Sequence, residues 1–152
     1  MKEKHKAYMM QAINLAKKAK GKTFPNPLVG AVIVKNGKVI GRGYHKKAGS
    51  SHAEISALKK ANKAARGASL YVNLEPCAHY GKTPPCVDSI IKNRIKKVYA
   101  SMRDPNPLVN GRGIEILRRN KVGVKVGICR KEAMLLNSSY INRVKQDVYR
   151  DR

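Results

Sequence analysis

Acidic residues are scarce in this chain of 152 residues, which holds 9 Asp and Glu against 33 Lys and Arg and has a formal net charge of +24. A basic balance of this size makes nucleic acid a partner to consider. The lysines, however, outnumber the arginines and are spread over nearly every segment, which indicates a compositional bias instead of a binding stripe. We therefore expect nucleic acid not to be the functional partner. Three of the few carboxylates, Glu54, Glu75 and Asp104, lie inside the motifs described below.

Long hydrophobic runs are also lacking. The longest, at residues 28–34, is far shorter than the ~20 residues that a membrane-spanning helix needs. The N-terminal residues show no apolar signal core followed by a small-residue cleavage site. We therefore expect a cytoplasmic protein without a membrane partner.

Cysteine is rare and odd in number, with 3 residues, and Cys129 lies far along the chain from Cys77 and Cys86. This pattern does not resemble a disulfide framework, which would need paired cysteines. Reduced thiols that can bind a metal are the better interpretation.

The length and the pattern of elements predict one α/β domain over residues 1–152. Asn36 and Gly37 lie between two apolar runs, which is a strong β-hairpin signal. The later strands alternate with helices and should therefore be parallel. We predict a three-layer α/β/α sandwich around a five-stranded mixed sheet, with ligands bound beyond the carboxyl ends of the strands. The helices are expected at residues 3–20, 50–66, 84–95, 114–120 and 131–148, and the strands within 28–45 and at 69–74, 96–102 and 122–128.

One histidine and two cysteines fall where this fold would bring them together. His52 opens the second helix, Cys77 follows the third strand, and Cys86 opens the third helix. Three such ligands suit zinc and leave a fourth position for water, as in catalytic zinc sites. If Thr83 is the N-cap, Cys86 lies in the first turn, where the helix dipole favours a thiolate. We predict one Zn²⁺ per chain, although eight residues separate the two cysteines.

Each of these residues has a structural alternative. His52 could be an ordinary histidine at a helix start, and Cys77 and Cys86 could be small buried residues. Ser51 and Glu54 fit a capping box, in which the carboxylate serves only the helix end. The combined pattern, however, is the arrangement of zinc nucleobase deaminases. It predicts hydrolytic deamination, in which water activated by zinc attacks an amino-bearing ring carbon and Glu54 transfers the proton.

Three motifs together make the pattern more specific: "HAE" at residues 52–54, "LEPCAHYGKTPPC" at 74–86 and "MRDPNPLVNGRG" at 102–113. They resemble the deaminase domain of the riboflavin biosynthesis protein, a member of the cytidine-deaminase-like superfamily. The resemblance implies the cytidine-deaminase-like fold. It also implies deamination of 2,5-diamino-6-(5-phosphoribosylamino)pyrimidin-4(3H)-one to 5-amino-6-(5-phosphoribosylamino)uracil and ammonia, a step of riboflavin biosynthesis.

The resemblance also implies roles for individual residues. His52, Cys77 and Cys86 would ligate zinc, and Glu54 would be the catalytic proton carrier. The residues that match the family's substrate-binding positions are Asn26, His45, His79, Lys82, Asp104 and Asn106. Among them, Asn26 would face the pyrimidine, Lys82 would contact the phosphate, and the loop with Asp104 and Asn106 would close over the ribose phosphate. The histidines could instead be ordinary loop residues, and the proline-flanked asparagines could be turn residues.

The family usually carries a fused reductase, but no Gly-rich dinucleotide-binding loop is seen in this sequence. We therefore expect a stand-alone deaminase without a reductase domain, and a separate reductase polypeptide for the next step. The family also tends to form dimers or larger assemblies, which implies a homo-oligomer. Two rival functions stay open. One is a tRNA adenosine deaminase, which would have Cys-x2-Cys, or another nucleobase deaminase, and the other is a non-catalytic zinc-binding module.

Overall fold

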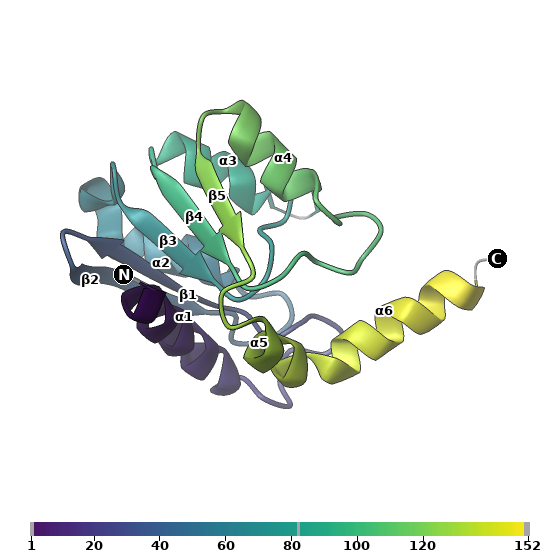
Figure 1. Cartoon of the computed structure of the whole chain (residues 1–152). Coiled ribbons are helices and arrows are strands. Elements are labelled where there is room, and N and C mark those ends of the chain that lie inside the picture. The colour runs from purple at the N-terminus through teal and green to yellow at the C-terminus, as the bar shows by residue number, and fades with distance from the viewer. Residues whose placement is uncertain (1, 82, 151–152) are drawn as a thin grey trace.

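The computed structural model describes residues 2–81 and 83–150, and it contains the predicted five-stranded mixed sheet (Figure 1). The strand order is β2-β1-β3-β4-β5. β1 pairs antiparallel with β2 and β3, whereas β3, β4 and β5 run parallel, as their alternation with helices predicted. The strands are β1 (Gly30–Lys35), β2 (Lys38–Tyr44), β3 (Ser69–Val72), β4 (Lys97–Ala100) and β5 (Gly123–Val126).

Helices cover both faces of the sheet and form the predicted α/β/α layers (Figure 1). One face packs on α2 (Ala53–Ala61), α3 (Cys86–Lys92) and α4 (Arg112–Arg119), and the other packs on α1 (Lys2–Lys17) and α5 (Arg130–Leu136). A short 3₁₀ helix, η1 (Asn62–Ala65), follows α2, and α6 (Ser138–Arg150) projects away from the sheet (Figure 1). This is the three-layer arrangement around a five-stranded mixed sheet that the sequence predicted.

The hairpin between β1 and β2 turns at Asn36 and Gly37, as predicted. Both residues have positive φ, 51° and 75°, which is the conformation that an Asn-Gly turn accommodates at low cost. Alternate residues of β1 then face opposite sides of the sheet. Ala31 and Ile33 join the core under α2 and α3, whereas Val32 joins the core under α1.

Two glycines allow helices to approach the hairpin more closely than any side chain would permit. A Cβ added to Gly30 would overlap the backbone carbonyl of Ala12 in α1. A Cβ added to Gly43 would lie 2.5 Å from the carbonyl oxygen of Ala53 in α2. The start of α2, which carries the motif "HAE", is therefore held directly against β2.

The structure corrects the sequence predictions at three places: the N-cap residues of two helices and the continuity of the closing helix. His52, not Ser51, is the N-cap of α2, and no side chain caps that helix end, so the capping box is not formed. Pro85, not Thr83, is the N-cap of α3, because Cys86 is already the first helical residue. The predicted closing helix over residues 131–148 is two helices, α5 and α6, which are separated at Asn137.

The break at Asn137 has a tertiary cause. Its side-chain oxygen accepts the backbone N–H of Leu28 at 2.8 Å, and its amide nitrogen donates to the Leu28 carbonyl at 2.9 Å. Asn73 donates to the same carbonyl at 2.9 Å and accepts the N–H of Gly30 at 2.8 Å. Two buried asparagines thus fix the segment that enters β1.

Within residues 2–81 and 83–150, no helix combines the length and the apolar character that crossing a lipid bilayer requires.

Candidate active site

A cavity of about 290 Å³ opens beyond the carboxyl ends of β3 and β4. It is lined by the segment before β1, the start of α2, the residues that follow β3 and β4, and Tyr140 of α6. This is the position that open α/β sheets favour for ligands, because loops at the strand ends can converge there. The sequence predicted the same position.

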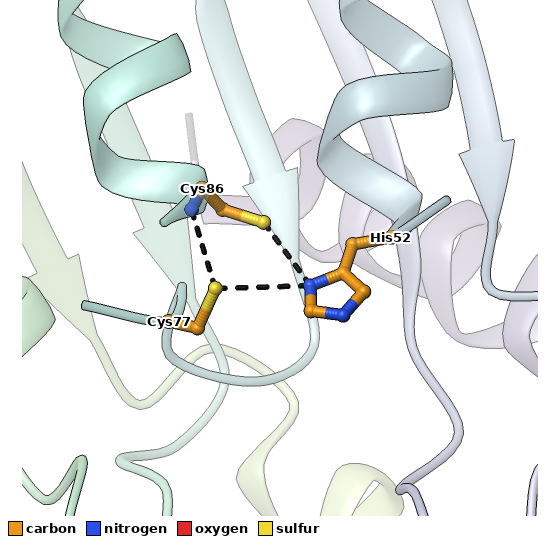
Figure 2. A group of neighbouring side chains, drawn as sticks. All are labelled: His52, Cys77 and Cys86. Atoms are coloured by element: carbon orange, nitrogen blue, oxygen red, sulfur yellow. Dashed lines mark hydrogen bonds between the residues drawn. The ribbon is translucent and has the colours of Figure 1, made fainter. Parts of the chain in front are cut away.

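Three side chains that could bind a metal lie together here, and two of them, His52 and Cys77, line the cavity. His52 Nδ1 lies 3.3 Å from Cys86 Sγ and 3.7 Å from Cys77 Sγ, and all the candidate ligand atoms lie within 4.8 Å of one another (Figure 2). A tetrahedral zinc ion, with bonds of about 2.1 Å to nitrogen and about 2.3 Å to sulfur, needs donors roughly 3.6 Å apart. The cluster therefore fits zinc in both ligand type and spacing.

The eight-residue gap between the cysteines does not separate them. Cys77 ends the loop that follows β3, and Cys86 begins α3 directly beside it. The backbone N–H of Cys86 donates to Cys77 Sγ at 3.2 Å, and the N–H of Val87 donates to the Cys77 carbonyl at 3.2 Å. The described residues between them, 78–81 and 83–85, lie outside helices and strands, while the two sulfurs stay together.

The cysteine environment favours a thiolate at Cys77. Hydrogen bonding by Cys86, and then by His52, lowers the pKa of Cys77 below its ordinary value. The same hydrogen bond and burial raise the pKa of Cys86. A negative sulfur that faces a histidine and a helix N-terminus is the state that a divalent cation requires.

Glu54 lies next to the cluster but offers no ligand atom to it. Its side chain is 3% exposed and lines the cavity, two residues after His52 in the first turn of α2. Burial, with a further contribution from the nearby Cys77, raises the pKa of Glu54 to about 7. A carboxyl group with this pKa can both take up and release a proton near neutral pH, as a general base that becomes a general acid must.

Asn26 and His45 form a polar pair beside His52, since the ring centroids of His45 and His52 are 5.4 Å apart. His45 is buried, and burial lowers its pKa, so its ring is neutral. Its Nδ1 lies 3.2 Å from the carbonyl oxygen of Ser51, which can only accept, so Nδ1 carries the proton. Its Nε2 then accepts from Asn26 Nδ2 at 3.2 Å. This arrangement leaves the side-chain oxygen of Asn26 available to a ligand.

Most of the other predicted substrate residues also reach the cavity. His79, Asp104 and Asn106 line it, and the backbone N–H of Asn106 donates to Asp104 Oδ1 at 3.0 Å. Burial raises the pKa of Asp104. Lys82 lies outside the described residues. The structure thus brings together every predicted site residue except Lys82.

Glu75 has a role that sequence reasoning did not assign. Its carboxylate accepts four backbone N–H groups: those of Asp104 and Gly111 at 3.1 and 2.9 Å, and those of Gly113 and Ile114 at 3.0 and 3.3 Å. It therefore anchors the loop that carries Asp104. The sequence feature that could have indicated this role is the position of Glu75, a carboxylate two residues before Cys77 in a chain with few acidic residues. Tyr140, which donates to Asp104 Oδ1 at 2.8 Å, had no comparable signal.

The fold and the site together define a class, that of hydrolytic deaminases with the cytidine-deaminase-like fold. The model of the cytidine and deoxycytidylate deaminase zinc-binding region matches residues 2–102. The diaminohydroxyphosphoribosylamino-pyrimidine deaminase of Buchnera aphidicola (Schizaphis graminum) is 48% identical over 93% of this chain and 97% of its own length. The chain belongs to this deaminase family, and within it to the branch of the diaminohydroxyphosphoribosylaminopyrimidine deaminases.

Two further relatives are longer than this chain. The riboflavin biosynthesis protein RibD of Aquifex aeolicus is 52% identical over 97% of this chain, which spans 41% of that protein. A solved structure of RibD from Acinetobacter baumannii superposes with a TM-score of 0.92 at 48% identity, and covers 94% of this chain and 40% of its own. The chain thus corresponds to less than half of these relatives.

Proposed function

We propose that this deaminase hydrolyses the 2-amino group of 2,5-diamino-6-(5-phosphoribosylamino)pyrimidin-4(3H)-one, giving 5-amino-6-(5-phosphoribosylamino)uracil and ammonia in riboflavin biosynthesis. The observation that carries the proposal is the His/Cys/Cys cluster with Glu54 beside it, at a cavity that also holds the predicted substrate residues. The name of the Buchnera relative, which this chain matches over 97% of that protein's length, supports the same substrate.

His52, Cys77 and Cys86 would hold one zinc ion per chain. When bound, zinc lowers the pKa of a coordinated water to about 7 and so supplies a nucleophile near neutral pH. Three protein ligands would leave a fourth position for water, which is the arrangement of catalytic and not structural zinc sites.

Glu54 would move the proton. It would take one proton from the attacking water as the C–O bond forms and deliver it to the ring nitrogen. It would then take the second proton of that water and deliver it to the amine, which leaves as ammonia when the C–N bond breaks. Its burial supports this role, because a pKa near 7 allows the same carboxyl group to be base and then acid.

The remaining residues would bind the substrate. Asn26 and His45 would orient the pyrimidine, since Asn26 presents a free oxygen to the cavity. His79, Asp104 and Asn106 would contact the substrate further along the cavity. Lys82 would meet the phosphate, because cationic donors bind phosphate strongly.

The reduction that follows would be carried out by a separate reductase polypeptide, with residues 1–152 as one deaminase domain. The printed name of the Buchnera relative, that of a deaminase alone, supports this proposal. Cytoplasmic location and a homo-oligomeric state stay predictions from the sequence.

The test is to purify the protein without chelator, count zinc per chain, and incubate it separately with the diaminopyrimidine ribotide and with tRNA. We expect one zinc per chain and release of ammonia from the ribotide. Ammonia from tRNA only would show an RNA-editing deaminase instead. Zinc binding without ammonia from either substrate would favour a non-catalytic module.

A further inference from the structure

Three residues at the junction of α5 and α6 bind both walls of the cavity, and we name Asn137, Tyr140 and Arg143 the brace. Asn137 bonds both backbone groups of Leu28, at 2.8 and 2.9 Å. Arg143 donates to the carbonyl of Pro25 at 3.1 Å, so two brace residues hold the segment that carries Asn26.

Tyr140 reaches the other wall. Its hydroxyl donates to Asp104 Oδ1 at 2.8 Å, and its ring lines the cavity. The brace residues follow one another at intervals of three, which places them on one side of the chain, and Tyr140 among them lines the cavity. Segments that are more than 75 residues apart in sequence are thus held together by the start of α6.

The contact with Tyr140 divides the two oxygens of Asp104 between protein and ligand. Oδ1 already accepts from Tyr140 and from the backbone N–H of Asn106 at 3.0 Å. Oδ2 has no hydrogen-bond partner among the described residues. It is still not closed off from solvent, because among these residues the buried side-chain atom without a partner is Ser101 Oγ. Oδ2 is therefore open to the cavity that Asp104 lines.

An ionised carboxylate oxygen accepts hydrogen bonds and donates none. Asp104 Oδ2 would therefore receive a hydroxyl or an N–H of the substrate and would repel its phosphate. The brace also lies outside residues 2–102, which match the shared deaminase model. Asp104 is therefore held both from within that region, by Glu75, and from outside it, by Tyr140.

We infer that Tyr140 is a positioning residue for substrate binding: by occupying Oδ1 of Asp104 it directs Oδ2 to a donor group on the sugar side of the substrate. The inference rests on the proposed function for the identity of the substrate. Because Asp104 contacts a part of the substrate that does not react, its orientation should affect KM and leave kcat nearly unchanged.

The experiment is a double-mutant cycle with Tyr140→Phe, Asp104→Ala and the combined variant, measured as KM and kcat for ammonia release. Tyr140→Phe should raise KM roughly tenfold, as expected for a lost hydrogen bond to a charged group, with kcat changed less than about twofold. In the Asp104→Ala background it should change neither parameter, because the hydroxyl then has no oxygen to orient. If Asp104→Ala does not fold, Asp104→Asn replaces it, and the Tyr140 effect should shrink because a neutral amide accepts a weaker hydrogen bond.

Tyr8→Phe is the matched control, since its hydroxyl donates to the Gly37 carbonyl at 3.2 Å, outside the cavity. It should leave both kinetic parameters unchanged. The inference is overturned if Tyr140→Phe leaves KM unchanged or lowers kcat alone. It is also overturned if Tyr140→Phe raises KM by the same factor in the wild type and in the Asp104→Ala background. The cycle runs on whichever pyrimidine nucleotide the wild-type protein deaminates, so failure with the ribotide would reject the proposed substrate without deciding the role of Tyr140.

Discussion

At the scale of single residues, three buried carboxyl groups of this acid-poor chain line the same cavity and are distinguished by what they contact. Glu75 is bonded to four backbone N–H groups and anchors a loop. Asp104 shares one oxygen between Asn106 and Tyr140. Glu54 has no capping role and stands beside the metal-binding cluster, which leaves it free for proton transfer.

Glu54→Gln should therefore reduce turnover by about 10²- to 10⁴-fold, the usual contribution of a general acid–base group. The amide has nearly the same shape but cannot carry the proton. Zinc content and thermal unfolding should stay as in the wild type, because Glu54 is not a ligand. The measurements are ammonia release, metal analysis and a melting curve.

Glu115→Gln is the control for this substitution. Glu115 pairs with Arg119 on the exposed side of α4, where an ion pair contributes little. This variant should keep full activity. Full activity in Glu54→Gln would instead assign the proton transfer to another group.

The sequence allowed the meeting of His52, Cys77 and Cys86 near Glu54 to be predicted, because each lies in a short motif at a helix start or a strand end. Tyr140 could not be predicted in the same way. Its partner, Asp104, is 36 residues away, and a tyrosine near the start of a basic helix has no distinctive neighbours in sequence. Contacts of this kind are set by packing, which a local pattern does not encode.

At the scale of elements, the position of α1 depends on one glycine of β1. The nearest atoms to a Cβ at Gly30 belong to the backbone of Ala12 and Ala16, which cannot rotate away as a side chain could. The backbones of α1 and β1 can thus approach this closely only because residue 30 has no side chain.

Gly30→Ala should therefore lower the free energy of unfolding by about 3 kcal/mol, at the upper end of what overpacking costs. Chemical denaturation measures this change. Gly123→Ala in β5 is the matched control, because its nearest neighbour is the flexible side chain of Lys97 at 3.4 Å. Equal losses in the two variants would contradict the close packing of α1 on β1.

The order of the elements was predictable from the sequence, but the break between α5 and α6 was not. The hairpin was encoded locally by Asn36 and Gly37, and alternation of helices and strands gave the parallel pairs. At the break, the side chain of Asn137 bonds the backbone of Leu28, which lies 109 residues away in the sequence. Asparagine lowers helix propensity only slightly, so its presence in the sequence does not predict a helix end. The break became evident only from the contact with Leu28 in the structure.

At the scale of the whole molecule, the chain has a formal net charge of +24, whereas the proposed substrate carries a negatively charged phosphate. A positive field raises the encounter rate with anions and is screened by salt. We expect kcat/KM for the ribotide to fall roughly tenfold as salt rises from about 0.01 M to about 0.5 M. Initial rates at substrate concentrations below KM measure this.

The dephosphorylated nucleoside gives the comparison, because it carries no charge to be attracted. Its kcat/KM should depend far less on salt. An equal dependence for both substrates would mean that salt acts on the protein and not on the encounter.

The sheet has two open edges, β2 and β5, and both carry cations that are exposed to solvent. Lys38 and Arg42 lie in β2, and Lys125 lies in β5. Two copies that approached edge to edge would bring like charges opposite one another, which opposes strand pairing. Repulsion between these cations therefore disfavours amyloid-like addition of further strands to the sheet.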